Sequence, residues 1–266
     1  LIPLVANEAW VGDLMGLSLK NVVLRAYAPE KSKKTKSGES FPGKYSANES
    51  GNAEKGGYAC SAAENTAKIE KKQKKRKPVY EELGEMLFTH FGVSGPLVLS
   101  ASSYLADSPN GALLEIDLKP GLTAEQLDLR ILRDFEKYKH KQVQNAMCDL
   151  LPQRLIDAVL HVAGVDAEIT VDNLTREQRG AIVRTLKCLP LTVRAARPVE
   201  EAIITRGGVL IKEIIPSTME SRIVPGLYFA GEVIDVDACT GGFNLQIAWS
   251  TAYLAATDVC RNKEED

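Results

Sequence analysis

The spacing of apolar residues changes twice along this chain of 266 residues, and these changes restrict the folds that it can adopt. Apolar and polar residues alternate at 17–27 (LSLKNVVLRAY) and 112–121 (ALLEIDLKPG), which predicts half-buried strands. Between residues 123 and 186 the period becomes about 3.6, which predicts amphipathic helices, and strand-like runs return from residue 189. The order of these segments predicts a mixed fold, α+β or α/β.

Helix start and stop signals divide the middle segment. Thr123 with Gln126, and Thr175 with Gln178, have the spacing of a capping box, in which the two side chains satisfy each other's free backbone N–H groups. Gly164 follows the run LPQRLIDAVLHVA and is a typical helix stop. We therefore predict three or four helices in this segment.

The run GEMLFTHFGVSGPLVLSASSYLA, residues 84–106, predicts a short apolar strand, a turn and a helix. Gly92 and Gly95 favour the turn, and Ser94 and Pro96 favour the start of the helix. Together with the alternating runs on either side, this strand predicts a small sheet or barrel.

Residues 29–78 lack the apolar content of a folded segment. Lys, Ser, Glu, Gly and Asn dominate, and Ile69 is the only aliphatic residue larger than Ala. Such a segment buries too little apolar surface to offset its chain entropy, so we predict a flexible insertion in a loop between two strands. Its basic run KKQKKRK, residues 71–77, favours a solvated loop over a nucleic-acid or nuclear-targeting patch, because no aromatic residues are interleaved with it.

The composition excludes several classes of protein. A formal net charge of −2 gives no overall basic field for nucleic acid or an anionic membrane. The five cysteines form no C-x-x-C motif, which favours reduced, cytosolic thiols. No apolar run reaches the roughly 20 residues of a membrane span. The start at LIPLVANEAW, without Met, indicates a fragment.

The three histidines give no metal site. We place His140 and His161 in the predicted helices, far from carboxylates or thiols at a ligand spacing, and His90 before the Gly92 turn. The sequence also contains no G-x-S-x-G, H-E-x-x-H or G-x-x-x-x-G-K motif. A structural role is therefore favoured for all three histidines.

The run GLYFAGEVIDVDACTGGFNLQIAWSTAYLAA, residues 226–256, has the order of a strand, a glycine-containing loop and a helix. Residues 227–230 predict a buried strand, and Leu245, Trp249 and Tyr253 lie on the apolar face of the predicted helix. The helix amino terminus carries free N–H groups and partial positive charge, which favour an electron-rich oxygen. On periodicity alone, the alternative is an ordinary glycine-rich turn of a doubly wound sheet.

Two adjacent glycines precede this motif. In AIITRGGVLIKEI, residues 202–214, two extended runs meet at Gly207 and Gly208. Because glycine has no Cβ, a flat ligand can approach the backbone closely there.

The runs TRGGV, PSTMESRIVPGLYFAGEVIDVDACTGGFNLQIAWSTAYLAA and GEMLFTHFGVSGPLVLSAS closely resemble the BaiN/YhiN-like flavoproteins. These are NAD(P)/FAD-dependent, or aminoacetone oxidase family, oxidoreductases. The resemblance implies a Rossmann-like FAD-binding domain built from an amino-terminal G-x-G-x-x-G piece and a carboxy-terminal strand and helix, with β-rich and helical domains inserted between them. The chain corresponds to everything after the first piece, so we expect a fragment that is inactive alone.

The resemblance also implies which residues contact FAD. Gly231 and Glu232 match the ribityl and phosphate region, and residues 241–245 match the pyrimidine edge. Thr205, Gly207 and Gly208 match the segment close to the isoalloxazine. Phe243 stands where the family often has Tyr, which removes a hydroxyl contact. The expected cofactor-binding residues are Thr205, Gly207, Gly208, Gly231, Glu232, Asp235, Gly241, Gly242, Phe243, Asn244 and Leu245. No catalytic residue is assigned, and Cys239 has no partner cysteine for redox chemistry.

We therefore expect an FAD-dependent oxidoreductase that transfers hydride between flavin and a small-molecule substrate, with NAD(P)H as co-substrate. The alternative is a non-catalytic binding or scaffold module that retains a flavoprotein fold element. The expected partners are the substrate and the missing amino-terminal FAD-binding segment, without nucleic acid or a membrane, in the cytoplasm. The expected units are 1–121 (β-rich, with the insertion), 122–188 (helical), 189–225 (β-rich return strands) and 226–266 (carboxy-terminal part of the FAD-binding domain).

Overall fold

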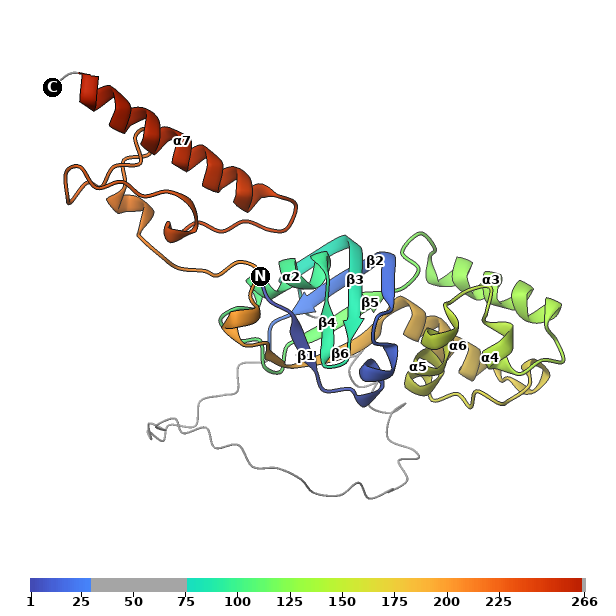
Figure 1. Cartoon of the computed structure of the whole chain (residues 1–266). Coiled ribbons are helices and arrows are strands. Elements are labelled where there is room, and N and C mark those ends of the chain that lie inside the picture. Colours follow the sequence, from blue (N-terminus) through green and yellow to red (C-terminus); the bar gives the residue numbers. More distant parts are fainter. Residues whose placement is uncertain (30–75, 265–266) are drawn as a thin grey trace, which may run out of the picture.

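A closed six-stranded barrel forms the centre of the protein in a computed structural model that describes residues 1–29 and 76–264 (Figure 1). Around the barrel the strands follow the order β1, β4, β3, β2, β5, β6, and every neighbouring pair is antiparallel. Their bounds are β1 (Leu4–Ala6), β2 (Ser18–Tyr27), β3 (Tyr80–Thr89), β4 (Gly92–Ser94), β5 (Leu113–Asp117) and β6 (Leu189–Ala196). The prediction of a small sheet or barrel is confirmed.

The alternating sequence of the strands fills the barrel interior. In β2, Val22, Leu24 and Ala26 are buried, and on β3 Met86 and Phe88 are at most 1% exposed. Side chains two residues apart point to the same face of a strand, so these residues share the inner face. The 3-10 helix η1 (Ala9–Leu14) contributes Val11 and Leu14 to the same core.

One helix packs against the barrel wall. Helix α2 (Pro96–Tyr104) follows β4 directly, has Pro96 at its first turn, and buries Leu97, Val98 and Ala101. The helix was predicted, but its N-cap residue is Gly95 at a φ of 91°, and Ser94 belongs to β4. A Cβ at Gly95 would lie 3.0 Å from the backbone of Met86, so the close approach of β3 requires glycine at this cap.

The predicted helices extend from one end of the barrel (Figure 1). Thr123 and Gln126 form the expected capping box at the start of α3, Thr175 and Gln178 form that of α6, and Gly164 ends α5 in the left-handed conformation. The core of this region is continuous with the barrel core. The elements are α3 (Ala124–Lys137), α4 (Val143–Ala146), α5 (Gln153–Ala163), η2 (Val171–Asn173) and α6 (Arg176–Lys187).

His140 differs from its predicted position. It lies in the turn after α3 and not in a helix, and its Nδ1 is 2.8 Å from Asp172 Oδ2. The carboxylate is 32 residues away in sequence, so only the packing of the helices brings it near. His161 lies in α5 as predicted, exposed to solvent.

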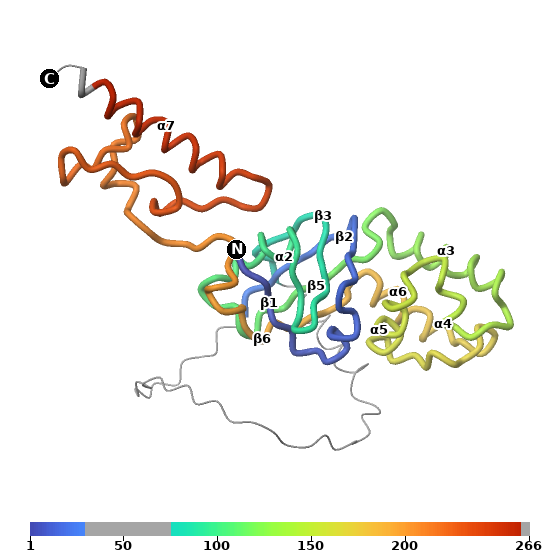
Figure 2. Tube along the Cα trace, viewed as in Figure 1, coloured from blue at the N-terminus to red at the C-terminus, as the bar shows by residue number. Residues whose placement is uncertain are grey.

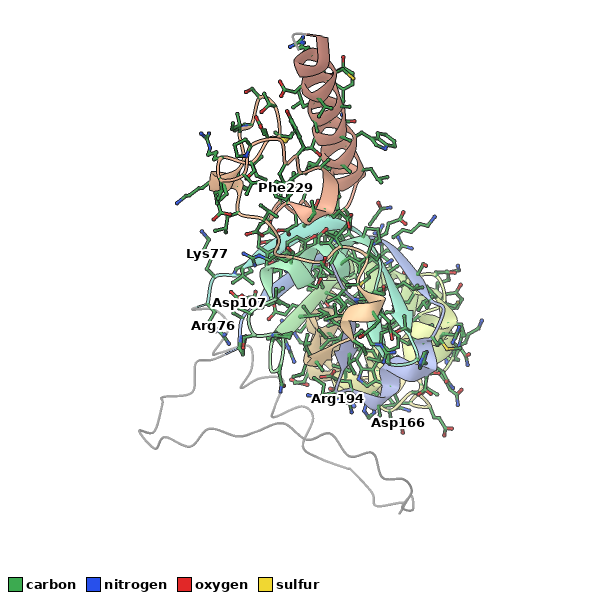
Figure 3. The ribbon with its side chains drawn as sticks, turned by 60° about the vertical axis from the view of Figure 1, so that its left-hand side comes forward. Arg76, Lys77, Asp107, Asp166, Arg194 and Phe229 are labelled. Carbon is green, nitrogen blue, oxygen red and sulfur yellow. The ribbon has the colours of Figure 1, made fainter. Side chains whose placement is uncertain are left out.

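The carboxy-terminal part extends from the opposite end of the barrel, as the Cα trace shows (Figure 2). It ends in the predicted long helix, and Phe229 lies in its packed interior above the barrel (Figure 3). Its elements are the 3-10 helices η3 (Val199–Glu201), η4 (Ile211–Glu213) and η5 (Gly231–Val233), followed by α7 (Phe243–Glu264).

Two strand predictions for this part are wrong. Residues 227–230 form only the isolated bridge between Glu220 and Tyr228, and Leu227 is 43% exposed. Residues 202–214 form no strand beyond single bridges at Val209 and Ile214, because the described residues offer no neighbouring strand to pair with them.

The predicted flexible insertion at 29–78 lies almost wholly outside the described residues. None of the helices in residues 1–29 and 76–264 combines the length and the hydrophobicity that a transmembrane segment requires.

Candidate cofactor-binding site

A loop closed by one asparagine precedes α7. The Asn244 side chain accepts a hydrogen bond from the backbone N–H of Ala238 (2.9 Å) and donates one to the carbonyl of the same residue (2.8 Å). Gly241 and Gly242, at φ values of 119° and 86°, turn the chain into the helix. The predicted residue Asn244 therefore fixes the shape of the loop at residues 238–244.

Open space faces this loop. A Cβ at Gly242 would meet no atom within 4 Å, and the same holds at Gly207. Phe243 and Leu245, at the start of α7, are 60% and 59% exposed. A ligand could thus reach the backbone at Gly242 from solvent, next to the apolar side chains of Phe243 and Leu245.

The predicted residue Gly208 lies against the chain at residues 233–235, which includes the predicted residue Asp235. Val209 donates to the carbonyl of Val233 (2.8 Å) and accepts from the N–H of Asp235 (3.0 Å), so the chain after Gly208 runs alongside residues 233–235. A Cβ at Gly208 would stand 2.3 Å from the Val233 oxygen. Only glycine allows this approach, and the pairing brings Gly208 beside residues 233–235, which precede the loop at 238–244 in the chain.

Helix α7 holds the chain at Gly231. The N–H of Gly231 donates to Thr251 Oγ1 (2.9 Å), whose hydroxyl in turn donates to the carbonyl of Ile247 (2.8 Å). Tyr228 donates its hydroxyl to Asp258 on the same helix (2.9 Å). Glu232 is exposed, so the structure brings Gly231, but not the Glu232 side chain, into a packed arrangement.

Helix α2 contacts residues 237–240 from the barrel side. The α2 residues that make these contacts were not identified from the sequence. The hydroxyl oxygens of Ser100 and Thr240 are 3.1 Å apart, and Ser103 donates to Asp237 Oδ2 at 3.3 Å. Charge at the Cys239 thiol, and its hydrogen bond with Tyr104, raise the pKa of Tyr104. The three hydroxyl residues have a spacing of three and four, so they share one face of α2, and this spacing was the available signal.

The arrangement fits a flat, anionic cofactor. The amino terminus of the 22-residue helix α7 offers free N–H groups and partial positive charge to an electron-rich oxygen. The open glycine backbone at Gly242 and Gly207 leaves room for a ring system, whereas the ring of Phe243 lies close to Gly241. No group of three or more His, Cys, Asp or Glu side chains in the described ranges could hold a metal ion.

Residues 61–204 match the family described as HI0933-like protein barrel and H2TH domain. The match spans more than half of the chain. The chain belongs to this family. The HI0933-like proteins are the flavoprotein family that includes the BaiN/YhiN-like proteins, so the predicted membership is confirmed.

Curated relatives of this HI0933-like chain align over about two thirds of it. It is 31% identical to the 3-dehydro-bile acid delta(4,6)-reductase of Clostridium scindens over 183 residues, which cover 68% of the chain and 45% of the relative. It is 35% identical over 180 residues (67% and 43%) to the ribosomal RNA dihydrouridine synthase of Escherichia coli. The enzyme of the same name from Haemophilus influenzae is 34% identical over 177 residues (66% and 42%). The matches span less than half the length of these relatives.

Proposed function

We propose that this protein is an FAD-dependent oxidoreductase that reduces a carbon–carbon double bond conjugated to a carbonyl. The loop at 238–244, closed by Asn244 and leading into α7, is the observation that carries the proposal. Membership of a flavoprotein family and the bile-acid reductase relative support oxidoreductase chemistry.

The reactions for which the relatives are named support a conjugated carbon–carbon double bond as the bond that is reduced. A 3-dehydro bile acid with delta-4,6 double bonds has a ketone conjugated to them, and the double bond that becomes saturated in dihydrouridine is conjugated to a ring carbonyl. The loop at 238–244 and the glycine backbone at Gly207 and Gly208 would hold FAD, which would supply the two-electron chemistry of this reduction with NAD(P)H as the electron source.

We further propose that residues 226–266 are the carboxy-terminal part of a Rossmann-like FAD-binding domain, after the β-rich (1–121), helical (122–188) and return (189–225) units. Exposed apolar residues in the carboxy-terminal part support this, because contiguous exposed apolar surface marks interfaces. The exposed large apolar residues of the carboxy-terminal part are Val199, Ile203, Leu210, Ile211, Ile223, Val224, Leu227, Val233, Val236, Phe243, Leu245, Trp249 and Tyr253. An amino-terminal FAD-binding segment is the partner that we propose for them.

The non-catalytic binding module remains the second candidate, supported by the same apolar surface. We place the enzyme in the cytoplasm, where its cysteines stay reduced. The thiols of Cys148, Cys239 and Cys260 are free.

FAD occupancy tests the proposal. The full gene product should purify with flavin absorbance, and Gly242→Val should lower its FAD occupancy at least about tenfold. The valine would both occupy the open space at the loop and resist a φ of 86°.

Gly226→Val is the matched control. Gly226 also has a positive φ, of 78°, and open space at its Cβ, but it lies in a turn away from the loop. It should keep full occupancy. A colourless wild-type protein that cannot be reconstituted with FAD contradicts the function. Full occupancy in Gly242→Val contradicts the site alone.

A further inference from the structure

Helix α2 and the loop at 238–244 belong to regions with separate hydrophobic cores. Helix α2 packs on the barrel through Leu97, Val98 and Ala101, which are at most 3% exposed. The loop belongs to the carboxy-terminal part, whose core has three buried residues, and none of them lies in the loop. Contacts other than the apolar core must therefore fix the position of the loop against the barrel.

Two hydrogen bonds join α2 to the chain at 237–240. The hydroxyl oxygens of Ser100 and Thr240 are 3.1 Å apart, and Ser103 donates to Asp237 Oδ2 at 3.3 Å. Ser100 is 2% exposed, so its hydroxyl is shielded from competing water. The two bonds hold the chain on either side of the two residues that lie between their partners.

Asn244 has a different task in the same loop. Its side chain bonds the N–H and the carbonyl of Ala238, which fixes the separation of the two ends of the loop. Bonds within the loop fix its shape but not its place relative to the barrel. The bonds from α2 supply that place, and a binding site needs such supporting contacts to keep its geometry.

We propose that Ser100 and Ser103 are positioning residues of the cofactor site, which hold the loop at 238–244 where it binds FAD. This inference rests on the proposed function, since it makes α2 a part of that FAD site. Each side chain acts through the loop and not by touching the cofactor. Loss of either hydroxyl should loosen the loop and weaken FAD binding, while α2 stays packed on the barrel through its apolar face.

The Cys239 thiol reports the position of the loop without FAD. It lies between the two anchored residues, and Tyr104 on α2 hydrogen-bonds it. Ser100→Ala in this chain should raise the rate of iodoacetamide alkylation at Cys239 about three- to tenfold, the size expected for the loss of one hydrogen bond. Peptide mass spectrometry measures this rate. The exposed Cys260 on α7 is the internal reference, and its rate should not change.

Ser102→Ala is the matched control. Ser102 lies on the same helix, is 3% exposed, and bonds the carbonyl of Leu99 (2.7 Å) and the N–H of Ile2 (2.9 Å) instead of the loop. This variant should leave the alkylation of Cys239 as in the wild type. Equal acceleration in Ser102→Ala and Ser100→Ala would show a general loosening of α2 and overturns the proposal. An unchanged rate in Ser100→Ala also overturns it.

FAD binding to the full gene product completes the test. Fluorescence titration of the FAD-free protein should give an affinity about three- to tenfold weaker for Ser100→Ala than for the wild type, and an unchanged affinity for Ser102→Ala. Equal affinity in Ser100→Ala and the wild type overturns the positioning role. A wild-type protein that binds no FAD contradicts the proposed function, whereas the alkylation of Cys239 still decides whether α2 holds the loop.

Discussion

The two regions of the protein differ greatly in the size of their hydrophobic cores. One region is the barrel with its helices, and the other is the carboxy-terminal part. The first region has one continuous core of 40 buried residues, which joins the barrel interior to α3, α5 and α6. The second region has a core of three buried residues, Ile214, Met219 and Ile234. Thirteen of the 19 exposed large apolar side chains lie in residues 199–264. The comparison shows that a long helix does not by itself form a stably folded unit. Helix α7 has 22 residues, but few buried side chains pack against it.

Separating the two regions should give the largest effect. A chain of residues 1–206 should unfold cooperatively, whereas a peptide of residues 207–266 should show no cooperative transition. Ordering costs about 1.5 kcal/mol per residue, and three buried side chains at about 1.5–3 kcal/mol each cannot offset that cost for some 60 residues. Circular dichroism during urea unfolding measures both. A cooperative transition in the peptide would remove the basis of the comparison.

Truncating one aromatic residue in each region should give the next largest effect. Phe88 is 0% exposed and packs 6.3 Å from Trp10 between ring centroids, so Phe88→Ala should lower the unfolding free energy by about 3–5 kcal/mol. Trp249 is 66% exposed, so Trp249→Ala in this chain should change the unfolding free energy by less than about 0.5 kcal/mol. Urea denaturation measures the difference.

The same Trp249 variant can sharpen the comparison. If an amino-terminal segment covers α7, Trp249→Ala should destabilise the full gene product more than it destabilises this chain. Equal effects in the two proteins would indicate that the segment does not cover this face of the helix.

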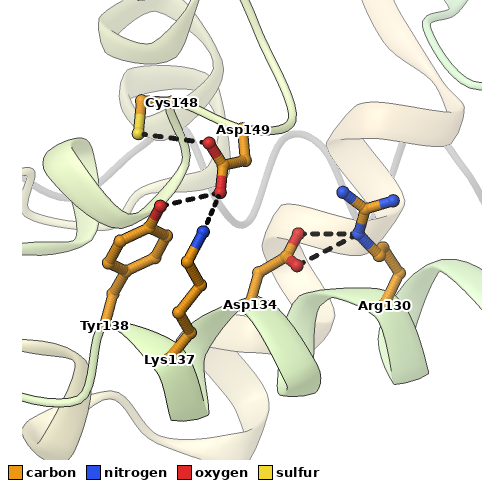
Figure 4. A network of polar contacts seen from close by, with 6 residues as sticks. All are labelled: Arg130, Asp134, Lys137, Tyr138, Cys148 and Asp149. Carbon is orange, nitrogen blue, oxygen red and sulfur yellow. Dashed lines mark hydrogen bonds and ion pairs between the residues drawn. The ribbon is translucent and has the colours of Figure 1, made fainter.

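The smallest effect is a pH dependence within the first region. Asp149 accepts hydrogen bonds from Lys137 (2.9 Å) and from the Tyr138 hydroxyl (2.7 Å), and these bonds, chiefly the first, lower the pKa of Asp149 below its ordinary value of 3.8 (Figure 4). A carboxylate with a lowered folded pKa stabilises the protein above its unfolded pKa. That stability is lost as the pH falls through the folded pKa.

Asp149→Asn should therefore lower the melting temperature slightly at pH 7, and this difference from the wild type should shrink as the pH falls below 3.8 and through the lower folded pKa of Asp149. The effect is small because the pair is exposed to solvent. Asp107→Asn is the control, since Asp107 is exposed and makes no side-chain hydrogen bond in the described part of the chain. A larger loss at pH 2 than at pH 7 would contradict the assignment.

Sequence patterns predicted the longer barrel strands and the longer helices, because their signals are local. The short strand β1 was not predicted, and β4 lies where a turn at Gly92 was predicted. Both capping boxes and the Gly164 stop involve residues at most a few positions apart, and they form as predicted. The alternation in 17–27 and 112–121 became β2 and β5 for the same reason. The family itself was also recognisable from its motifs.

The candidate site was only partly accessible from sequence. The residues expected to bind FAD were found by resemblance, and their contact with the cofactor stays a prediction. Sequence reasoning missed the α2 hydroxyl groups of Ser100, Ser103 and Tyr104, because they meet the loop across more than 130 residues of chain. No local pattern encodes such a long-range pairing.

The sequence by itself determined most of the longer strands and helices before residue 199, since periodicity, caps and glycine stops act within a few residues of each other. Only the tertiary structure decided the order in which the strands close into a barrel and the Asp172 partner of His140. It also decided that the apolar run at 227–230 is not a buried strand. A strand needs neighbours along its whole length to satisfy its backbone hydrogen bonds, and in the described residues this run pairs only with the short segment 219–221.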